Sequence, residues 1–129
     1  MNEREWMEAF EKGILPEESF HHAEHVKMAF LYLRKYEPLE ALGRFSRDLA
    51  RFAAAKGKPD RYNETMTWAF LLLIRERAAR TESPQGWPEF SAGNADLLRW
   101  EDNILKKYYR PETLSSALAK SIFLFPDKF

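Results

Sequence analysis

The chain has 129 residues, a length that fits one domain with a sizeable hydrophobic core. Its 20 basic and 20 acidic residues balance, which argues against a general nucleic-acid or anionic-membrane binder, and the absence of cysteine excludes disulfides, thiolate zinc sites and thiol catalysis. The N-terminal sequence MNEREWMEAF lacks the apolar core of a signal peptide, and the longest apolar run, residues 68–74, is far too short to span a bilayer. We therefore expect a cytoplasmic protein.

Apolar residues in the first part of the chain recur at spacings of three and four, the pattern of amphipathic helices. Glycine, proline and N-capping residues divide this pattern at short intervals and set the ends of the predicted helices. The predicted helices cover residues 2–12, 19–36, 38–56 and 63–79, bounded by Gly13, Ser19, Pro38, Gly57 and Asn63. From Met66 to Ile74 the fourth helix is apolar nearly all round, so we expect it to be the central buried helix.

The remainder of the chain is richer in turn-forming residues. Residues 81–93 are predicted to be a long loop with one turn of helix near residues 88–90. A fifth helix over residues 94–109 and a short helix opening at Pro111 follow, and the apolar tail, residues 122–129, is expected to pack as an extended strap. No alternation is long enough to argue for a sheet. The sequence therefore predicts an all-α, single-domain antiparallel helical bundle of about five main helices, with a short C-terminal helix and an extended tail.

The chain's three histidines, His21, His22 and His25, fall within two turns at the start of the second predicted helix. A helical wheel puts them on or beside the inward face, away from the charged residues. Because short connections make successive helices antiparallel, the start of the fourth helix and the end of the fifth should meet these turns. We expect a polar pocket at this end of the bundle.

The expected pocket combines candidate catalytic residues with further polar groups from distant segments. The candidate catalytic residues are His22, His25, Glu64 and Tyr109, and the other expected lining residues are Tyr62, Asn63, Thr67 and Asp127. Asp127 is expected either to pair with a histidine or to cap an exposed helix N-terminus. The cap is favoured, since such termini attract carboxylates.

Two interpretations of Glu64 are open. It either sits in the first turn of its helix, satisfied by backbone donors, or it faces the histidines, where it could orient an imidazole or share a metal. Two inward histidines and a carboxylate from a facing helix could hold a divalent transition metal, and the candidate ligands are His21, His22, His25 and Glu64. A metal-free polar pocket and purely structural histidines are the alternatives, because the Glu-x-x-His pairs of di-iron bundles and an HExxH motif are both missing.

Three motifs stand out together: F-H-H-x-x-H at residues 20–25, Y-[H/N]-E-T-x-T at residues 62–67, and a C-terminal P-D at residues 126–127. In this combination the chain resembles a group of small, all-helical bacterial proteins of unassigned function. The resemblance implies a helical fold and a site at these motifs, without implying a reaction. In that group a histidine often occupies the position of Asn63, so the asparagine would make a poorer metal site.

Two functions from different classes fit these features. In the first, the pocket binds a small molecule and supports proton-transfer or metal-assisted chemistry on it. In the second, the protein is a non-enzymatic interaction module with structural histidines, and its aromatic tail or the loop at residues 81–93 docks a protein partner. Enclosed, convergent histidines favour the first function, whereas solvent-facing histidines beside a large exposed apolar patch favour the second.

Overall fold

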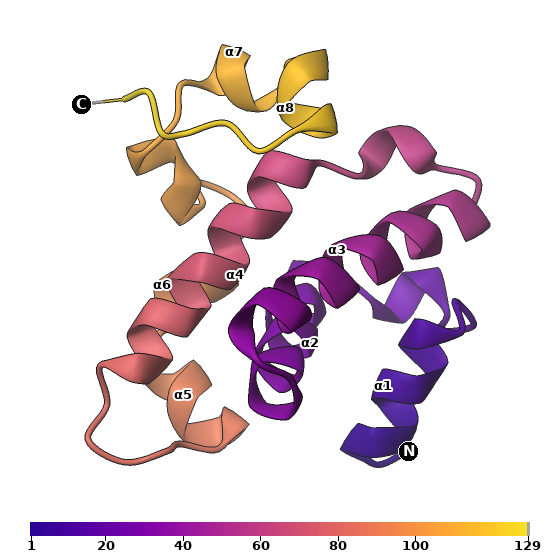
Figure 1. Ribbon diagram of the computed structural model, residues 1–129, viewed down its shortest axis with the longest axis vertical. Coiled ribbons are helices and arrows are strands. Elements are labelled where there is room, and N and C mark those ends of the chain that lie inside the picture. The colour runs from indigo at the N-terminus through magenta and orange to yellow at the C-terminus, as the bar shows by residue number, and fades with distance from the viewer. Residues whose placement is uncertain (129) are drawn as a thin grey trace.

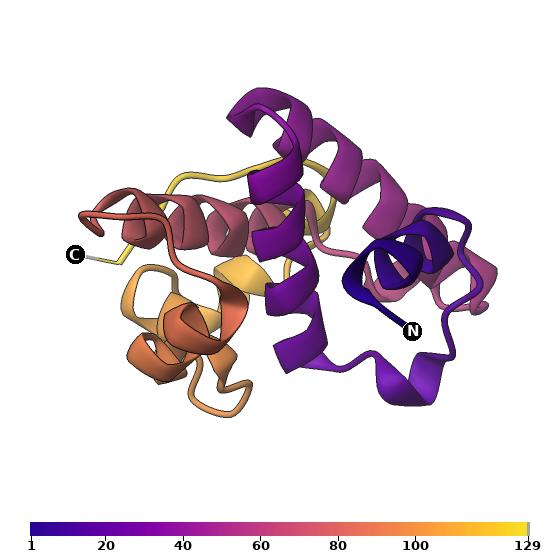
Figure 2. The same ribbon diagram turned by 90° about the horizontal axis from the view of Figure 1, so that it is seen from below.

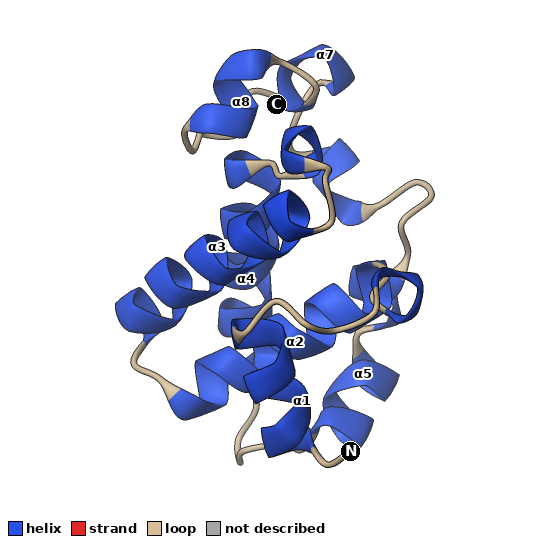
Figure 3. Cartoon of the chain, turned by 90° about the vertical axis from the view of Figure 1, so that its right-hand side faces the viewer, coloured by secondary structure: helices blue, strands red, loops and turns tan. Residues whose placement is uncertain are grey.

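Helices are the regular secondary structure of residues 1–128, the part of the chain that the computed structural model describes, and this part contains no strand (Figure 3). The predicted all-α class is confirmed. The elements are α1 (Glu3–Glu11), η1 (Glu17–Ser19), α2 (His22–Lys35), α3 (Pro38–Ala55), η2 (Pro59–Arg61), α4 (Glu64–Ala79), α5 (Trp87–Gly93), α6 (Ala95–Leu98), η3 (Ile104–Lys107), α7 (Pro111–Leu114) and α8 (Ala117–Ser121). Within residues 1–128, none of these helices has the length and apolar character needed to cross a membrane.

Local signals set several ends of the first four main helices, as predicted. The chain leaves α1 and α3 through Gly13 and Gly57, whose φ angles of 72° and 75° lie in the left-handed region that glycine enters without steric cost. Pro38 opens α3, and the Asn63 side chain caps α4 by accepting a hydrogen bond from the backbone N–H of Met66 at 2.9 Å.

The start of α2 differs from the prediction by three residues. Ser19 does not cap the helix, because it lies in the η1 turn and its hydroxyl donates to the carbonyl of Pro16. The helix begins at His22 instead. There the Glu24 carboxylate accepts a hydrogen bond from the backbone N–H of His21 at 2.8 Å, which satisfies a donor that the helix itself leaves free.

Helices α2 and α4 together form the centre of the fold. Figure 2 shows α2 standing between α4 on one side and α1 and α3 on the other, and it packs against α3, α4 and α6. Its buried residues cover several faces of the helix: Val26, Met28, Ala29, Phe30, Leu31 and Tyr32. The expectation that α4 is buried nearly all round was wrong at Leu72, which is 43% exposed. One face of α4 packs on α2 and α3 and another on α8 and η3, so Leu72 stays at the surface.

The helix predicted over residues 94–109 is interrupted, and this part of the prediction was wrong. After α6 the chain leaves the helical path, and Asp102 adopts a positive φ of 51°. Asn103 holds the turn, because its Oδ1 accepts from the Leu105 N–H at 3.0 Å and its Nδ2 donates to the Trp100 carbonyl at 3.2 Å. The short η3 follows, and Trp100 is placed in the turn instead of on a helix.

Two shorter segments also depart from the predicted boundaries. The end of the predicted loop forms α5, a longer helical segment than the single turn expected, because buried Phe90 packs on Phe30 with ring centroids 4.8 Å apart. The short helix opening at Pro111 ends at Leu114. A second helix, α8, then begins where the hydroxyl of Ser116 accepts from the backbone N–H of Ala119.

The C-terminal tail forms the expected strap along the start of α4 (Figure 1). Thr65, which is fully buried, holds it: its Oγ1 donates to the Ile122 carbonyl at 2.8 Å and accepts from the Leu124 N–H at 3.1 Å. The Tyr109 hydroxyl donates to the carbonyl of Leu124 at 2.7 Å. The strap therefore ties the start of α4 to the segment that follows η3.

The aromatic residues of the tail divide between core and surface. Phe123 stacks on Trp68 with ring centroids 5.3 Å apart, as the tail prediction required. Phe125 is 83% exposed, so the prediction that it packs onto the bundle was wrong; its ring meets the Phe123 ring edge-on, with centroids 5.7 Å apart. Backbone hydrogen bonds hold this part of the strap, and the side chains of Ile122 and Phe125 are exposed. Phe129, part of the predicted strap, lies outside the described residues.

We predict that Thr65→Val lowers the free energy of unfolding by about 1–3 kcal/mol, because the isosteric change leaves the Leu124 N–H and the Ile122 carbonyl without their partner. Amide hydrogen exchange should show lost protection at Leu124. Thr65→Ser keeps the hydroxyl and is the matched control, in which that protection should persist. Equal protection of Leu124 in the valine variant would contradict this role of the hydroxyl.

Candidate functional site

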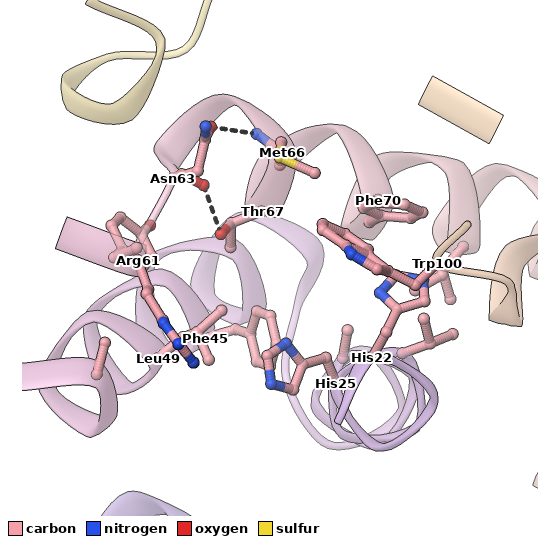
Figure 4. Close-up of a pocket in the computed structure, with 15 residues that line it drawn as sticks. His22, His25, Phe45, Leu49, Arg61, Asn63, Met66, Thr67, Phe70 and Trp100 are labelled. Atoms are coloured by element: carbon pink, nitrogen blue, oxygen red, sulfur yellow. Dashed lines mark hydrogen bonds between the residues drawn. The ribbon is translucent and has the colours of Figure 1, made fainter. Parts of the chain in front are cut away.

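A pocket of about 140 Å³ lies between the first turns of α2, the middle of α3 and the first half of α4 (Figure 4). His22 and His25 project into it from α2, and Thr67 faces it from α4. The wall is otherwise mostly apolar and aromatic. The lining residues are His22, His25, Val26, Ala29, Phe45, Leu49, Ala53, Arg61, Tyr62, Asn63, Met66, Thr67, Phe70, Ile74 and Trp100.

His22 is tied to α6. Its Nε2 lies 2.9 Å from the carbonyl oxygen of Leu97, and because a carbonyl only accepts, Nε2 carries the proton of the neutral ring. The ring contacts Phe70 and Trp100 at centroid distances of 4.7 and 5.2 Å. Burial among these rings lowers the pKa of His22, and the Leu97 carbonyl opposes that shift. The neutral tautomer leaves Nδ1 as an unprotonated acceptor.

His25 is the more strongly perturbed of the two pocket histidines. Its ring packs against Phe20 with centroids 4.5 Å apart. Burial lowers the pKa of His25 to about 4, and the nearby His22 and His21 rings add smaller effects in the same direction, while the backbone of Phe20 opposes them. His25 is therefore neutral at physiological pH, and one of its ring nitrogens is an acceptor whichever tautomer is present.

The position of Glu64 matches neither of the two interpretations completely. It lies in the first turn of α4, where the helix dipole favours a carboxylate, and it accepts a hydrogen bond from the Tyr62 hydroxyl. Tyr62 lines the pocket, whereas Glu64 does not. Burial raises the pKa of Tyr62, and the Glu64 carboxylate raises it further, while the hydroxyls of Ser46 and Thr67 act against these effects.

Asn63 and Thr67 are joined by a hydrogen bond at the start of α4. The Thr67 hydroxyl donates to the Asn63 carbonyl at 2.7 Å. This bond connects the wall of the pocket to the residue that caps α4. The Asn63 side chain is turned away from the pocket in Figure 4; its Nδ2 donates to the Leu114 carbonyl at 2.8 Å. Asn63 therefore shapes the pocket through its backbone rather than through its amide.

The mouth of the pocket carries two side chains that reach solvent. Trp100 lies across one side of it against His22, although 54% of the residue is exposed. Arg61 borders the opposite side, and its guanidinium lies 3.8 Å from the Glu17 carboxylate. Sequence reasoning did not place Trp100 in the pocket. The signal that could have done so is the run Glu101, Asp102 and Asn103, which favours a turn over a helix.

Besides Glu64, three residues expected in the pocket lie elsewhere. His21 is exposed in the position that precedes α2. Tyr109 is buried against the strap and borders a separate groove, because the break after α6 sends η3 to the other face of α4. Asp127 caps α7, as the favoured alternative proposed: it accepts from the Arg110 N–H at 3.0 Å and from the Thr113 hydroxyl, and these two bonds lower its pKa.

The proposed metal ligands do not come together. Within residues 1–128, no group of three or more histidine, cysteine, aspartate or glutamate side chains is arranged to hold a metal ion. The predicted set fails at two members, since His21 is exposed outside the pocket and Glu64 is directed to the Tyr62 hydroxyl. The pocket is left with the imidazoles of His22 and His25.

Comparison with known proteins gives no further guide to the site. The chain matches no protein-family model, and it is not significantly similar to any curated protein or to any solved structure with which it was compared.

We predict that the free energy of unfolding falls as the pH is lowered from about 6.5 towards 4. The unfolded chain binds a proton at His25 near pH 6.5, whereas the folded protein resists protonation until about pH 4, so the difference is worth about 3 kcal/mol once the pH reaches 4. Urea unfolding at pH 7 and at pH 4.5 measures this loss.

The variant His25→Phe should lose most of this pH dependence, because it removes the buried titrating group. His21→Gln, at an exposed position outside the pocket, is the control and should retain it. A His25→Phe variant with the full pH dependence of the original chain would show that another group is responsible.

Proposed function

We propose that this protein binds a compact, largely apolar small molecule in the pocket between α2, α3 and α4. The observation that carries the proposal is a pocket of about 140 Å³ lined mostly by aromatic and small aliphatic side chains, with two neutral imidazoles in its wall. An apolar cavity of about 150 Å³ suffices to hold benzene in another protein, so a ligand of roughly six to eight non-hydrogen atoms fits this pocket.

The resemblance noted in the sequence agrees with a role for this pocket. Its first two motifs, at residues 20–25 and 62–67, contribute His22, His25 and Thr67 to the wall. Residues chosen only for helix packing would not need to be polar at these positions. We therefore assign these residues of the two motifs to ligand binding in this chain.

Binding fits the site better than acid–base catalysis. A histidine whose conjugate acid has a pKa of about 4 is a weak base, far from the value near 7 that suits a general base at neutral pH. The carboxylate of Glu64 is separated from the pocket by Tyr62, and Tyr109 faces a different groove. The candidate catalytic residues are thus dispersed, and we propose no reaction.

One observation favours the alternative function, an interaction module. A groove of about 630 Å³ runs between α4 and the C-terminal strap, and exposed apolar side chains lie in it at Leu72 and Tyr108. Phe125, next to the Phe123 ring of this groove, is 83% exposed. If this surface were the functional one, changing Phe125 to Ser would abolish partner binding and leave the pocket unaffected.

The pocket can be tested by filling it. Ala53 of α3 lines the pocket, whereas its neighbour Ala54 is exposed and does not. We predict that the original chain and Ala54→Phe bind toluene or phenol with a Kd of about 1 mM or tighter in an NMR titration. Ala53→Phe should bind neither probe, because its ring occupies the space.

Circular dichroism of both variants checks that the helices persist. Binding that survives in folded Ala53→Phe would place the probe outside the pocket. If neither toluene nor phenol binds to the original chain, the proposed function is refuted.

A further inference from the structure

The hydrogen-bond donors inside the pocket are already used by the protein. Nε2–H of His22 donates to the Leu97 carbonyl at 2.9 Å, and the Thr67 hydroxyl donates to the Asn63 carbonyl at 2.7 Å. The Tyr62 hydroxyl donates to the Glu64 carboxylate. Each of these protons points to an acceptor supplied by the protein itself, so none of them remains for a ligand.

These side chains still have lone pairs that can accept hydrogen bonds from a ligand. A neutral His22 has Nδ1 unprotonated, a neutral His25 has one bare ring nitrogen in either tautomer, and the Thr67 oxygen keeps its lone pairs. The N–H of neutral His25 is directed to the backbone carbonyl of Phe20, the contact that opposes the fall in its pKa. The donor side chains of Arg61 and Trp100 stand at the mouth, where 73% of the Arg61 side chain and 54% of Trp100 are exposed. The interior of the pocket therefore accepts hydrogen bonds.

We infer that the ligand of this pocket is a hydrogen-bond donor, a compact apolar body that carries a neutral hydroxyl or N–H group, because the interior offers acceptors and its own donors are committed. This inference rests on the proposed function and specifies its ligand class. The donor group of the ligand would hydrogen-bond to a bare ring nitrogen of His22 or His25. The apolar body would fill the space between Phe45 and Phe70. A carboxylate would meet the donor side chains of Arg61 and Trp100 at the solvent-exposed mouth instead of the histidine acceptors inside.

Three probes of nearly equal size separate the possibilities. Phenol has a ring and a donor, toluene has the ring without a donor, and benzoate has the ring with an anion. A purely apolar pocket binds toluene more tightly than phenol, because burying the phenol hydroxyl without a partner costs free energy. We expect the reverse order here, with phenol at least about fivefold tighter than toluene and at least about tenfold tighter than benzoate.

Variants of the acceptors test which groups are responsible. His25→Phe and the isosteric Thr67→Val should each reduce the preference for phenol over toluene by a factor of about three or more while toluene still binds. His21→Gln, outside the pocket, should leave the preference unchanged. If His25→Phe fails to fold, Thr67→Val alone carries this test.

Each outcome has a distinct meaning. If toluene binds as tightly as phenol or more tightly, the pocket is a binding site but the donor inference is wrong. If benzoate binds most tightly, Arg61 selects the ligand, and the inference is again wrong. If no probe binds, the proposed function itself has failed, and the inference fails with it.

Discussion

The partial burial of two histidines, His22 and His25, between α2 and α4 is the constraint on which the site depends. An imidazole removed from water must stay neutral or find a counter-charge, and no carboxylate is hydrogen-bonded to either ring in the described chain. Both rings are therefore held neutral by burial. One of them, His22, is satisfied by a backbone carbonyl of α6, and this bond joins the first turn of α2 to a segment 75 positions further along the chain.

The start of α4 supports the pocket from one face and the C-terminal strap from another. Thr65 and Thr67 are separated by about 200° on the helix, so their hydroxyls point to different sides. Thr65 bonds the strap, and Thr67 faces the histidines. Asn63 adds a third link, because its amide donates to the Leu114 carbonyl at the end of α7. The polar residues of one helical turn thus fix the C-terminal segment and the wall of the pocket together.

The sequence was sufficient for the parts of the fold that local chemistry decides. Gly13 and Gly57 with positive φ, Pro38 at a helix start and the Asn63 cap are signals that act over a few residues, and each produced the predicted boundary. The convergence of His22 and His25 with Tyr62 and Thr67 followed from the antiparallel order of α2, α3 and α4.

The failures have two physical causes. The break at residues 99–103 contains neither glycine nor proline; Asp102 turns the backbone with a positive φ, and the side chain of Asn103 holds the turn through hydrogen bonds that leave no periodic signal in the sequence. Without that break Tyr109 was placed in the pocket, whereas the structure places it in a separate groove and brings Trp100 to the pocket instead. The exposed positions of Phe125 and Leu72 depend on which neighbours happen to cover the α4 surface, and no local rule determines that.

The most direct test of the central claim is the protonation of the imidazole rings, read from long-range proton–nitrogen NMR spectra of the unliganded protein at pH 5.5. The structure predicts that His25 is neutral at this pH, with one protonated and one bare ring nitrogen, and that His22 carries its proton on Nε2. A His25 ring with both nitrogens protonated at pH 5.5 would contradict this, because it would mean that the ring is not desolvated between α2 and α4.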